Sequence, residues 1–326
     1  WSGTGSAPTN PTHITSKKSP STTNTANEYN ISPYIREYLQ HTYVQNVYDT
    51  IPTTPTEQWC NVKVRRYRWN GTSYYMVDEK QYIAFDGYGY YEDGANPDNG
   101  NVMLTSSLTY NYWYDANNDP SSNQYQTAGH VTMRNASGYT VRWINLRTGD
   151  VETSGTGINP LVDVLRVFLT WNADGNELRI LDDTSTEIWR ARFVPIQECR
   201  YTPLTLDFVN KYGAWQREFM FKASYEEFEV QTQAYNIMQS SAVHYSTMEG
   251  QFSDFNINGR EDIRVNTGFV KEDFNDTIRQ IYLSERILLD GRPVQLKKKR
   301  ESKIKDINAR LRNFTLEFTY ANELIN

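Results

Sequence analysis

The chain has 326 residues with 33 Lys or Arg and 39 Asp or Glu, and its net charge of −6 argues against binding to nucleic-acid phosphates as its main function. No run reaches the ~20 apolar residues that span a bilayer, so we expect neither a nucleic-acid partner nor a membrane. With 24 Tyr, 8 Trp and 13 Phe, aromatic rings supply much of the apolar surface, a composition typical of proteins built from interfaces.

The first thirty residues are rich in Ser, Thr, Asn and Pro, which predicts a loop or linker with one strand at most. We expect this extended segment to become ordered when it docks on a partner. Ile31–Leu39 then predicts a short helix, because Ser32 is a candidate N-cap and Pro33 suits the first helical position.

Alternation of apolar and polar residues then predicts strands. Val62–Trp69 and Tyr74–Val77 flank Asn70-Gly71, and an Asn-Gly pair provides the positive φ of a tight hairpin turn. Further strands are expected over Tyr82–Tyr91 and Val102–Trp113.

A second block of short strands follows a polar stretch at Asp115–Gln126, where we place a domain boundary. Strands at such intervals, broken by turn residues, are typical of antiparallel sandwiches or barrels. They begin near Val131 and continue over Tyr139–Leu146, Val164–Trp171, Glu177–Leu181, Glu187–Val194, Leu204–Val209 and Trp215–Phe221.

The last eighty residues change character. Glu272–Leu283 predicts a helix whose apolar face carries Phe274, Ile278, Ile281 and Tyr282. The strands expected after it are Arg286–Leu289, Pro293–Leu296 beyond an Asp290-Gly291 turn, and Phe314–Tyr320. The predicted fold class is mainly β, with two antiparallel, immunoglobulin-like β-sandwich domains over residues 1–120 and 121–240 and a small α+β domain over residues 241–326.

Patterns for catalysis or metal binding are weak. No Gly-x-Ser-x-Gly nucleophile elbow occurs, and Cys60 and Cys199 are too far apart in sequence for a cysteine-built zinc site or a disulfide framework. The histidines show no metal-ligand spacing; they are His13, His41, His130 and His244. We therefore expect no enzymatic activity, no metal and no cofactor. Asp86–Gly94 is interpreted as a strand and turn, with aromatic contact to a carbohydrate as the alternative.

The basic cluster Lys297, Lys298, Lys299 and Arg300 has two interpretations. It is either a solvated tip that discourages edge pairing or a contact with an acidic neighbouring subunit. We expect Glu272–Arg300, including Phe274 on the helix, to supply one subunit contact and the N-terminal segment to supply another.

Leu204–Arg217 predicts two strands joined by the turn Asn210-Lys211-Tyr212-Gly213, with Gly213 in the left-handed conformation. This segment, together with Ile83–Tyr90 before it and Asn313–Ala321 at the end of the chain, resembles segments of virion structural proteins of tailed bacteriophages that infect Bacteroidota. The resemblance implies a tail, baseplate, collar or ring component that is built from β-sandwich domains and lacks catalytic residues. Its partners would be copies of itself and neighbouring virion proteins, and it would be assembled in the cytoplasm of the host bacterium.

Two other function classes stay open. Exposed aromatic rings could form a platform for host glycans or a receptor, and the candidates are Trp69, Tyr74, Tyr75, Tyr88 and Trp113. A glycan hydrolase is the third class. Its candidate carboxylates are Glu226, Glu227 and Glu229, on a predicted strand or its end, but such pairs are common in any β protein.

Overall fold

A computed structural model describes residues 7–18, 27–41, 59–94, 104–105, 107–113, 130–134, 138–156, 164–168, 174–198, 200–237, 248, 250–298 and 311–325. Strands dominate these residues and most of them pair antiparallel, so the mainly β class is confirmed. The elements are α1 (Ser32–Arg36), β1 (Trp59–Trp69), β2 (Tyr74–Phe85), the 3-10 turn η1 (Tyr91–Asp93), β3 (Thr109–Trp113), β4 (His130–Arg134), β5 (Thr140–Asn145), β6 (Val151–Thr156), β7 (Val164–Phe168), β8 (Asn176–Leu181), β9 (Glu187–Ile196), β10 (Leu204–Val209), β11 (Trp215–Met220), β12 (Tyr225–Asn236), β13 (Phe252–Val270), α2 (Phe274–Leu283), β14 (Ile287–Leu289), β15 (Arg292–Leu296) and β16 (Arg312–Glu323).

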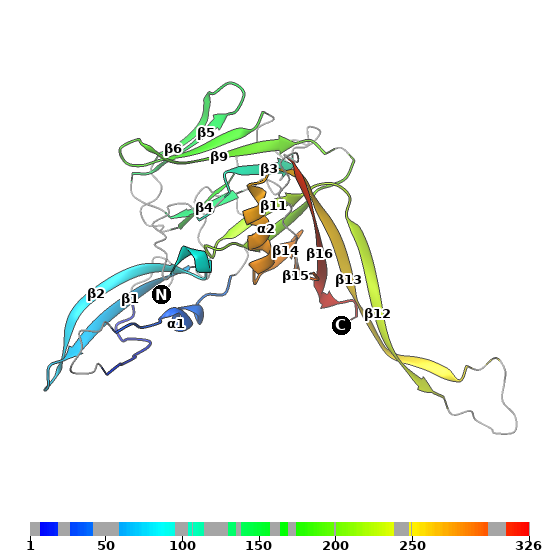
Figure 1. The fold of residues 1–326 in the computed structure, drawn as a ribbon, viewed down its shortest axis with the longest axis horizontal. Helices are drawn as coiled ribbons and strands as arrows, with labels where there is room; N and C mark the ends of the chain where they lie inside the picture. The colour runs from blue at the N-terminus through cyan, green and yellow to red at the C-terminus, as the bar shows by residue number, and fades with distance from the viewer. Residues whose placement is uncertain are drawn as a thin grey trace.

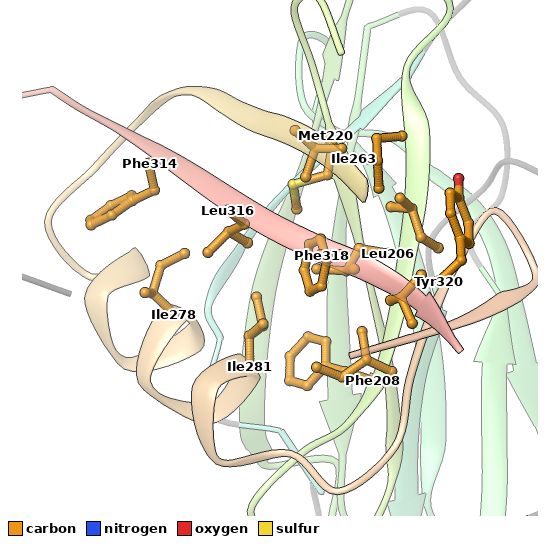
Figure 2. Packing of buried hydrophobic residues seen from close by; sticks show 14 of the residues in the cluster. Leu206, Phe208, Met220, Ile263, Ile278, Ile281, Phe314, Leu316, Phe318 and Tyr320 are labelled. Atoms are coloured by element: carbon orange, nitrogen blue, oxygen red, sulfur yellow. The ribbon is translucent and has the colours of Figure 1, made fainter. Parts of the chain in front are cut away.

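The largest sheet has seven strands in the order β11-β10-β14-β15-β16-β13-β12. Helix α2 lies against it and directs Ile278 and Ile281 toward Leu316 and Phe318 of β16 (Figure 2). The apolar face predicted for this helix is therefore the face that covers the core, and the helix begins at Phe274, two residues after the predicted start.

A second sheet has five strands in the order β3-β9-β8-β5-β6. Its core contains Trp143, Leu178 and Phe193, and the Tyr110 ring stacks on Phe193 with 4.8 Å between ring centroids. One edge differs from the prediction of antiparallel pairing, because β3 runs parallel to β9. Parallel neighbours need a long crossover connection, which local sequence patterns do not indicate.

Strand β11 contributes to both cores. Met220 packs in the core of the seven-stranded sheet, whereas Phe219 packs in the core of the five-stranded sheet together with Phe221, which directly follows the strand. Side chains alternate between the two faces of a strand, and every residue of β11 is buried. The strand thus joins the two cores.

The predicted divisions at residues 120 and 240 each separate strands that are hydrogen-bonded neighbours. The first division separates β3 from β9, and the second separates β12 from β13. Long-range pairing of this kind is set by tertiary packing, so the composition shifts used to place the divisions did not indicate it.

Several local predictions need adjustment. Strand β2 runs unbroken from Tyr74 to Phe85, although its two ends were predicted as separate strands, and Asp86–Tyr90 is irregular. Within Val102–Trp113 only β3 is a strand among the described residues. Helix α1 is shorter than predicted, with Ile31 rather than Ser32 at the N-cap.

The predicted turns are confirmed. Gly71 has φ 104° where β1 meets β2, and Asp290 and Gly291 have φ 50° and 79° between β14 and β15. The turn at Gly213 has φ 77°, the left-handed conformation that was predicted. These turns are local in sequence, and this is why the residues alone specify them.

Candidate assembly interface

Two long hairpins project from the body on opposite sides of the molecule (Figure 1). We call them the β1–β2 arm (Trp59–Phe85) and the β12–β13 arm (Tyr225–Ile237 with Gly250–Arg264). All twelve residues of β12 are exposed, and β2 is exposed over most of its length. Large apolar side chains on such arms are unburied surface, which in a soluble protein commonly marks a contact site.

The tip of the β1–β2 arm carries aromatic side chains. Trp69 and Tyr74 are cross-strand partners, 52% and 69% exposed, with ring centroids 4.9 Å apart. Tyr67, Tyr75 and Met76 are also exposed beside them. The tip thus presents a cluster of rings to solvent, while the base of the arm is anchored by buried Trp59.

The β12–β13 arm extends one face of the seven-stranded sheet beyond the core. Glu226 is the partner of buried Ile263, so alternation along β12 places Phe228 and Val230 on the same side as that core residue. Phe228 is 74% exposed and faces Glu261 across the hairpin. The apolar side of the sheet therefore continues past the core without a covering layer in the described part of the chain.

The outer half of this arm has a second pair of rings. A register shift lies between Gln231 and Gln233, opposite Asn256, which has φ 51°. Beyond it, the rings of Tyr235 and Phe255 pack edge to face with centroids 5.5 Å apart. Beyond the bulge, the alternation of side chains along β13 is inverted relative to β12. As a result, both sides of the arm carry aromatic residues.

The lysines predicted as a subunit contact have partners within the chain. Lys297 bonds Asp262 of β13, and Lys298 Nζ lies 2.7 Å from Glu317 of β16. The hydrogen bond to Asp262 raises the pKa of Lys297. Lys299 and Arg300 lie outside the described residues. The other predicted contact residue, Phe274, is half-buried and packs against the core, its ring centroid 6.5 Å from that of Phe314.

The turn residues Asn210 and Gly213 form a well-bonded loop. Asn210 Oδ1 accepts hydrogen bonds from the backbone N–H groups of Tyr212 and Ala214 at 3.0 and 3.2 Å, and Asn210 Nδ2 donates to the Leu104 carbonyl at 2.8 Å. The Gly213 N–H donates to the Asn210 carbonyl at 2.9 Å. Asn210 thus organises the turn and fixes it to a neighbouring segment.

This turn packs directly on the residues that follow the β1–β2 arm. The Tyr88 N–H donates to the Lys211 carbonyl at 2.8 Å. A Cβ at Gly87 would lie 2.5 Å from the Lys211 oxygen, so only glycine allows this approach. Two of the three segments on which the phage resemblance rests are therefore in contact.

A pocket of about 290 Å³ lies beside this contact, and its lining combines apolar residues with Arg36, Asp86 and Glu285. Asp86 is bonded by Arg36 Nε at 3.0 Å and by His41 Nε2 at 2.9 Å, and Arg36 also pairs with Glu285 at 2.9 Å. These contacts fix α1 to the body. Sequence reasoning missed the group because its members are scattered over 250 positions with no spacing pattern.

The candidate glycan-binding aromatics fall into two groups. Trp113 packs against the core of the five-stranded sheet, and Tyr88 is half-buried, with burial raising its pKa to about 12. Trp69, Tyr74 and Tyr75 are exposed together at the tip of the β1–β2 arm. Among the five, these three are available for a stacking contact.

Among the described residues, no group of His, Cys, Asp or Glu side chains is placed to hold a metal ion. In the same part of the chain, no helix has the length and apolar character needed to cross a membrane. No family model, curated protein or solved structure matches the chain.

Proposed function

We propose that this protein is a structural subunit of a tailed-bacteriophage virion that assembles into a ring in the tail, baseplate or collar. The observation that carries the proposal is the pair of exposed, aromatic-rich arms on opposite sides of the body (Figure 1). A subunit with contact surfaces at two ends can bind one copy at each end, and such head-to-tail contacts generate closed rings when the rotation closes.

The composition supports the same proposal. Tyrosine and tryptophan are enriched in protein interfaces because their rings bury a large area while their polar atoms stay hydrogen-bonded or wet. Here Tyr is the most frequent aromatic residue, and many of the rings outside the two cores lie on the arms. The resemblance of Ile83–Tyr90, Leu204–Arg217 and Asn313–Ala321 to segments of phage virion proteins supports the virion location.

Within this subunit we assign the body to the two sheets joined through β11. The five-stranded and seven-stranded sheets would act as the layers of a sandwich-like body, with Phe219 and Phe221 between them. The arms would then be extensions that reach neighbouring subunits.

Oligomeric state tests the proposal. Mass photometry and negative-stain electron microscopy of the purified chain are expected to show one discrete, closed oligomer. A protein that stays monomeric at tens of micromolar in low salt would contradict it.

A second candidate function is binding of a host glycan at the tip of the β1–β2 arm. The exposed pair of Trp69 and Tyr74 favours it, because aromatic faces stack on sugar rings. A glycan array tests it with the Trp69→Ala variant as the matched control. Binding by the wild type that the variant loses supports this function, and no binding on the array excludes it.

A further inference from the structure

The β1–β2 arm is basic although the whole chain is acidic. Between Trp59 and Phe85 there are five cationic side chains against two anionic ones, Asp78 and Glu79, a net charge of +3. The cationic residues are Lys63, Arg65, Arg66, Arg68 and Lys80. The arm therefore carries a local charge of the opposite sign to the net charge of −6 of the chain.

Some of this positive charge is unpaired. Glu79 binds Lys63 and Arg65, and Asp78 binds Arg66. Arg68 and Lys80 are exposed and form no ion pair with another described residue. Both lie on one side of the arm. Arg68 is four residues after Val64 along β1, so the two side chains point to the same side, and Lys80 is the cross-strand partner of Val64.

The β12–β13 arm is acidic. Residues 225–237 and 250–264 contain six acidic side chains against two basic ones, Arg260 and Arg264, a net charge of −4. The acidic residues are Glu226, Glu227, Glu229, Asp254, Glu261 and Asp262. Its charge is thus opposite to that of the β1–β2 arm and similar in size.

On this arm too, part of the charge lies outside the ion pairs. Glu261 and Asp262 pair with Arg292 and Lys297 of the body. Glu227 and Glu229 are exposed on one side of β12, and neither forms an ion pair within the described part of the chain, although both act on Lys297 electrostatically and raise its pKa. The acidic arm thus offers exposed carboxylates on one face and the apolar side chains of Phe228 and Val230 on the other.

From this complementarity we propose that the basic β1–β2 arm of one copy binds the acidic β12–β13 arm of a second copy. The inference rests on the proposed function and specifies which surfaces meet. The two arms would pair edge to edge, so that Arg68 and Lys80 lie beside Glu227 and Glu229 on one face of the joined strands. On the opposite face, the rings of Trp69 and Tyr74 would lie beside Phe228 and Val230. The charges set the orientation and the apolar burial supplies most of the affinity.

The geometry makes this contact intermolecular and head-to-tail. The two arms lie on opposite sides of the body, so they do not meet within one chain (Figure 1). Strand β12 is also the edge strand of its sheet, which leaves its outer backbone groups open to a neighbour. Each subunit would then use both arms, one toward each neighbour.

Charge reversal on each arm tests the contact. The basic-arm variant is Arg68→Glu with Lys80→Glu, and the acidic-arm variant is Glu227→Lys with Glu229→Lys. The control is Lys222→Glu with Lys271→Glu, which changes the net charge as much as the basic-arm variant does, at exposed positions outside the arms. Assembly is followed by mass photometry of the full chain over a concentration series in 50 mM and 1 M salt.

Each single-arm variant is expected to assemble at least tenfold more weakly than the wild type, because like charges then face each other. The control should assemble as the wild type does. A 1:1 mixture of the two arm variants should recover assembly into even-numbered oligomers, since each reversed arm meets a reversed partner. Wild-type assembly should weaken at 1 M salt, where the Debye length falls to about 3 Å.

The outcomes separate this inference from the proposed function. If the wild type assembles and the arm variants assemble equally well, or if their mixture does not recover assembly, the arm contact is wrong while the ring proposal stands. If the wild type is a monomer under all these conditions, the proposed function itself fails.

Discussion

Gly213 satisfies two constraints at the turn between β10 and β11. Its φ of 77° is in the left-handed region, where a side chain adds steric strain. A Cβ there would also lie 2.8 Å from the carbonyl carbon of Asp86. The glycine is needed both by the turn and by the close approach of Asp86, which directly follows the β1–β2 arm.

Gly213→Ala is therefore expected to lower the free energy of unfolding by about 2 to 4 kcal/mol, the sum of conformational strain and a displaced neighbour. Urea denaturation measures it. Gly149→Ala is the matched control, because Gly149 has φ 78° with nothing near the added methyl group. It should cost only about 1 kcal/mol, and equal losses in the two variants would refute the packing role of Gly213.

Glu218 is a buried carboxyl group in β11. Burial raises its pKa to about 8. A hydrogen bond from Gln216 Nε2 at 2.8 Å lowers the pKa but does not offset the effect of burial. At neutral pH the folded protein therefore keeps the Glu218 proton, whereas the unfolded chain, with a pKa near 4.5, has lost it.

This difference predicts the pH dependence of stability. The contribution of Glu218 is fully present below pH 4.5 and is lost as the pH rises from there to about 8, at up to about 1.4 kcal/mol per pH unit. Glu218→Gln should remove this component, so that thermal unfolding of the variant changes less between pH 5 and pH 8. Parallel pH profiles for the two proteins would show that Glu218 does not titrate in this way.

At the scale of elements, α2 stabilises the seven-stranded sheet through one face. Ile281 is fully buried against the core, while Leu283 in the same helix is half exposed. Ile281→Ala should cost about 2 to 5 kcal/mol through lost burial and the cavity that it leaves. Leu283→Ala should cost less than about 1 kcal/mol, and chemical denaturation of both variants compares them; similar costs would mean that the helix does not pack as described.

The sequence predicts those elements whose signals are local. Helix α2, the hairpin of β10 and β11, and β16 each have a clear apolar period or a turn motif, and each lies within a few residues of its predicted place. Strand β13 was not predicted, and of β12 only a strand or strand end at Glu226–Glu229 was expected. Their arm has no single buried face, so aromatic and charged residues occur on both sides and no binary pattern marks it.

The candidate site was harder to predict for a related reason. The basic residues Lys297 and Lys298 stand out in the sequence, but their partners Asp262 and Glu317 are on strands that only the folded sheet brings beside them. Charged residues that form no ion pair, by contrast, can be identified only after the ion pairs of the folded structure are known. This is why the arms, rather than the most visible basic cluster, emerge as the contact surfaces.

At the scale of the whole molecule, the net charge of −6 hides an uneven distribution. A basic arm projects on one side and an acidic arm on the other, and the two cores lie in the body between them (Figure 1). Opposite charges on the two arms favour a ring in which all subunits point in the same direction. They disfavour contact between two identical arms, because those arms carry like charges.

The most direct test of assembly through the arms is hydrogen–deuterium exchange of the chain, compared between assembled and dilute samples. The amides of β12 and of the β1–β2 tip should exchange markedly more slowly in the assembled state, while those of the two cores should be unchanged. Protection confined to the body, with both arms exchanging as fast as in the dilute protein, would contradict the account.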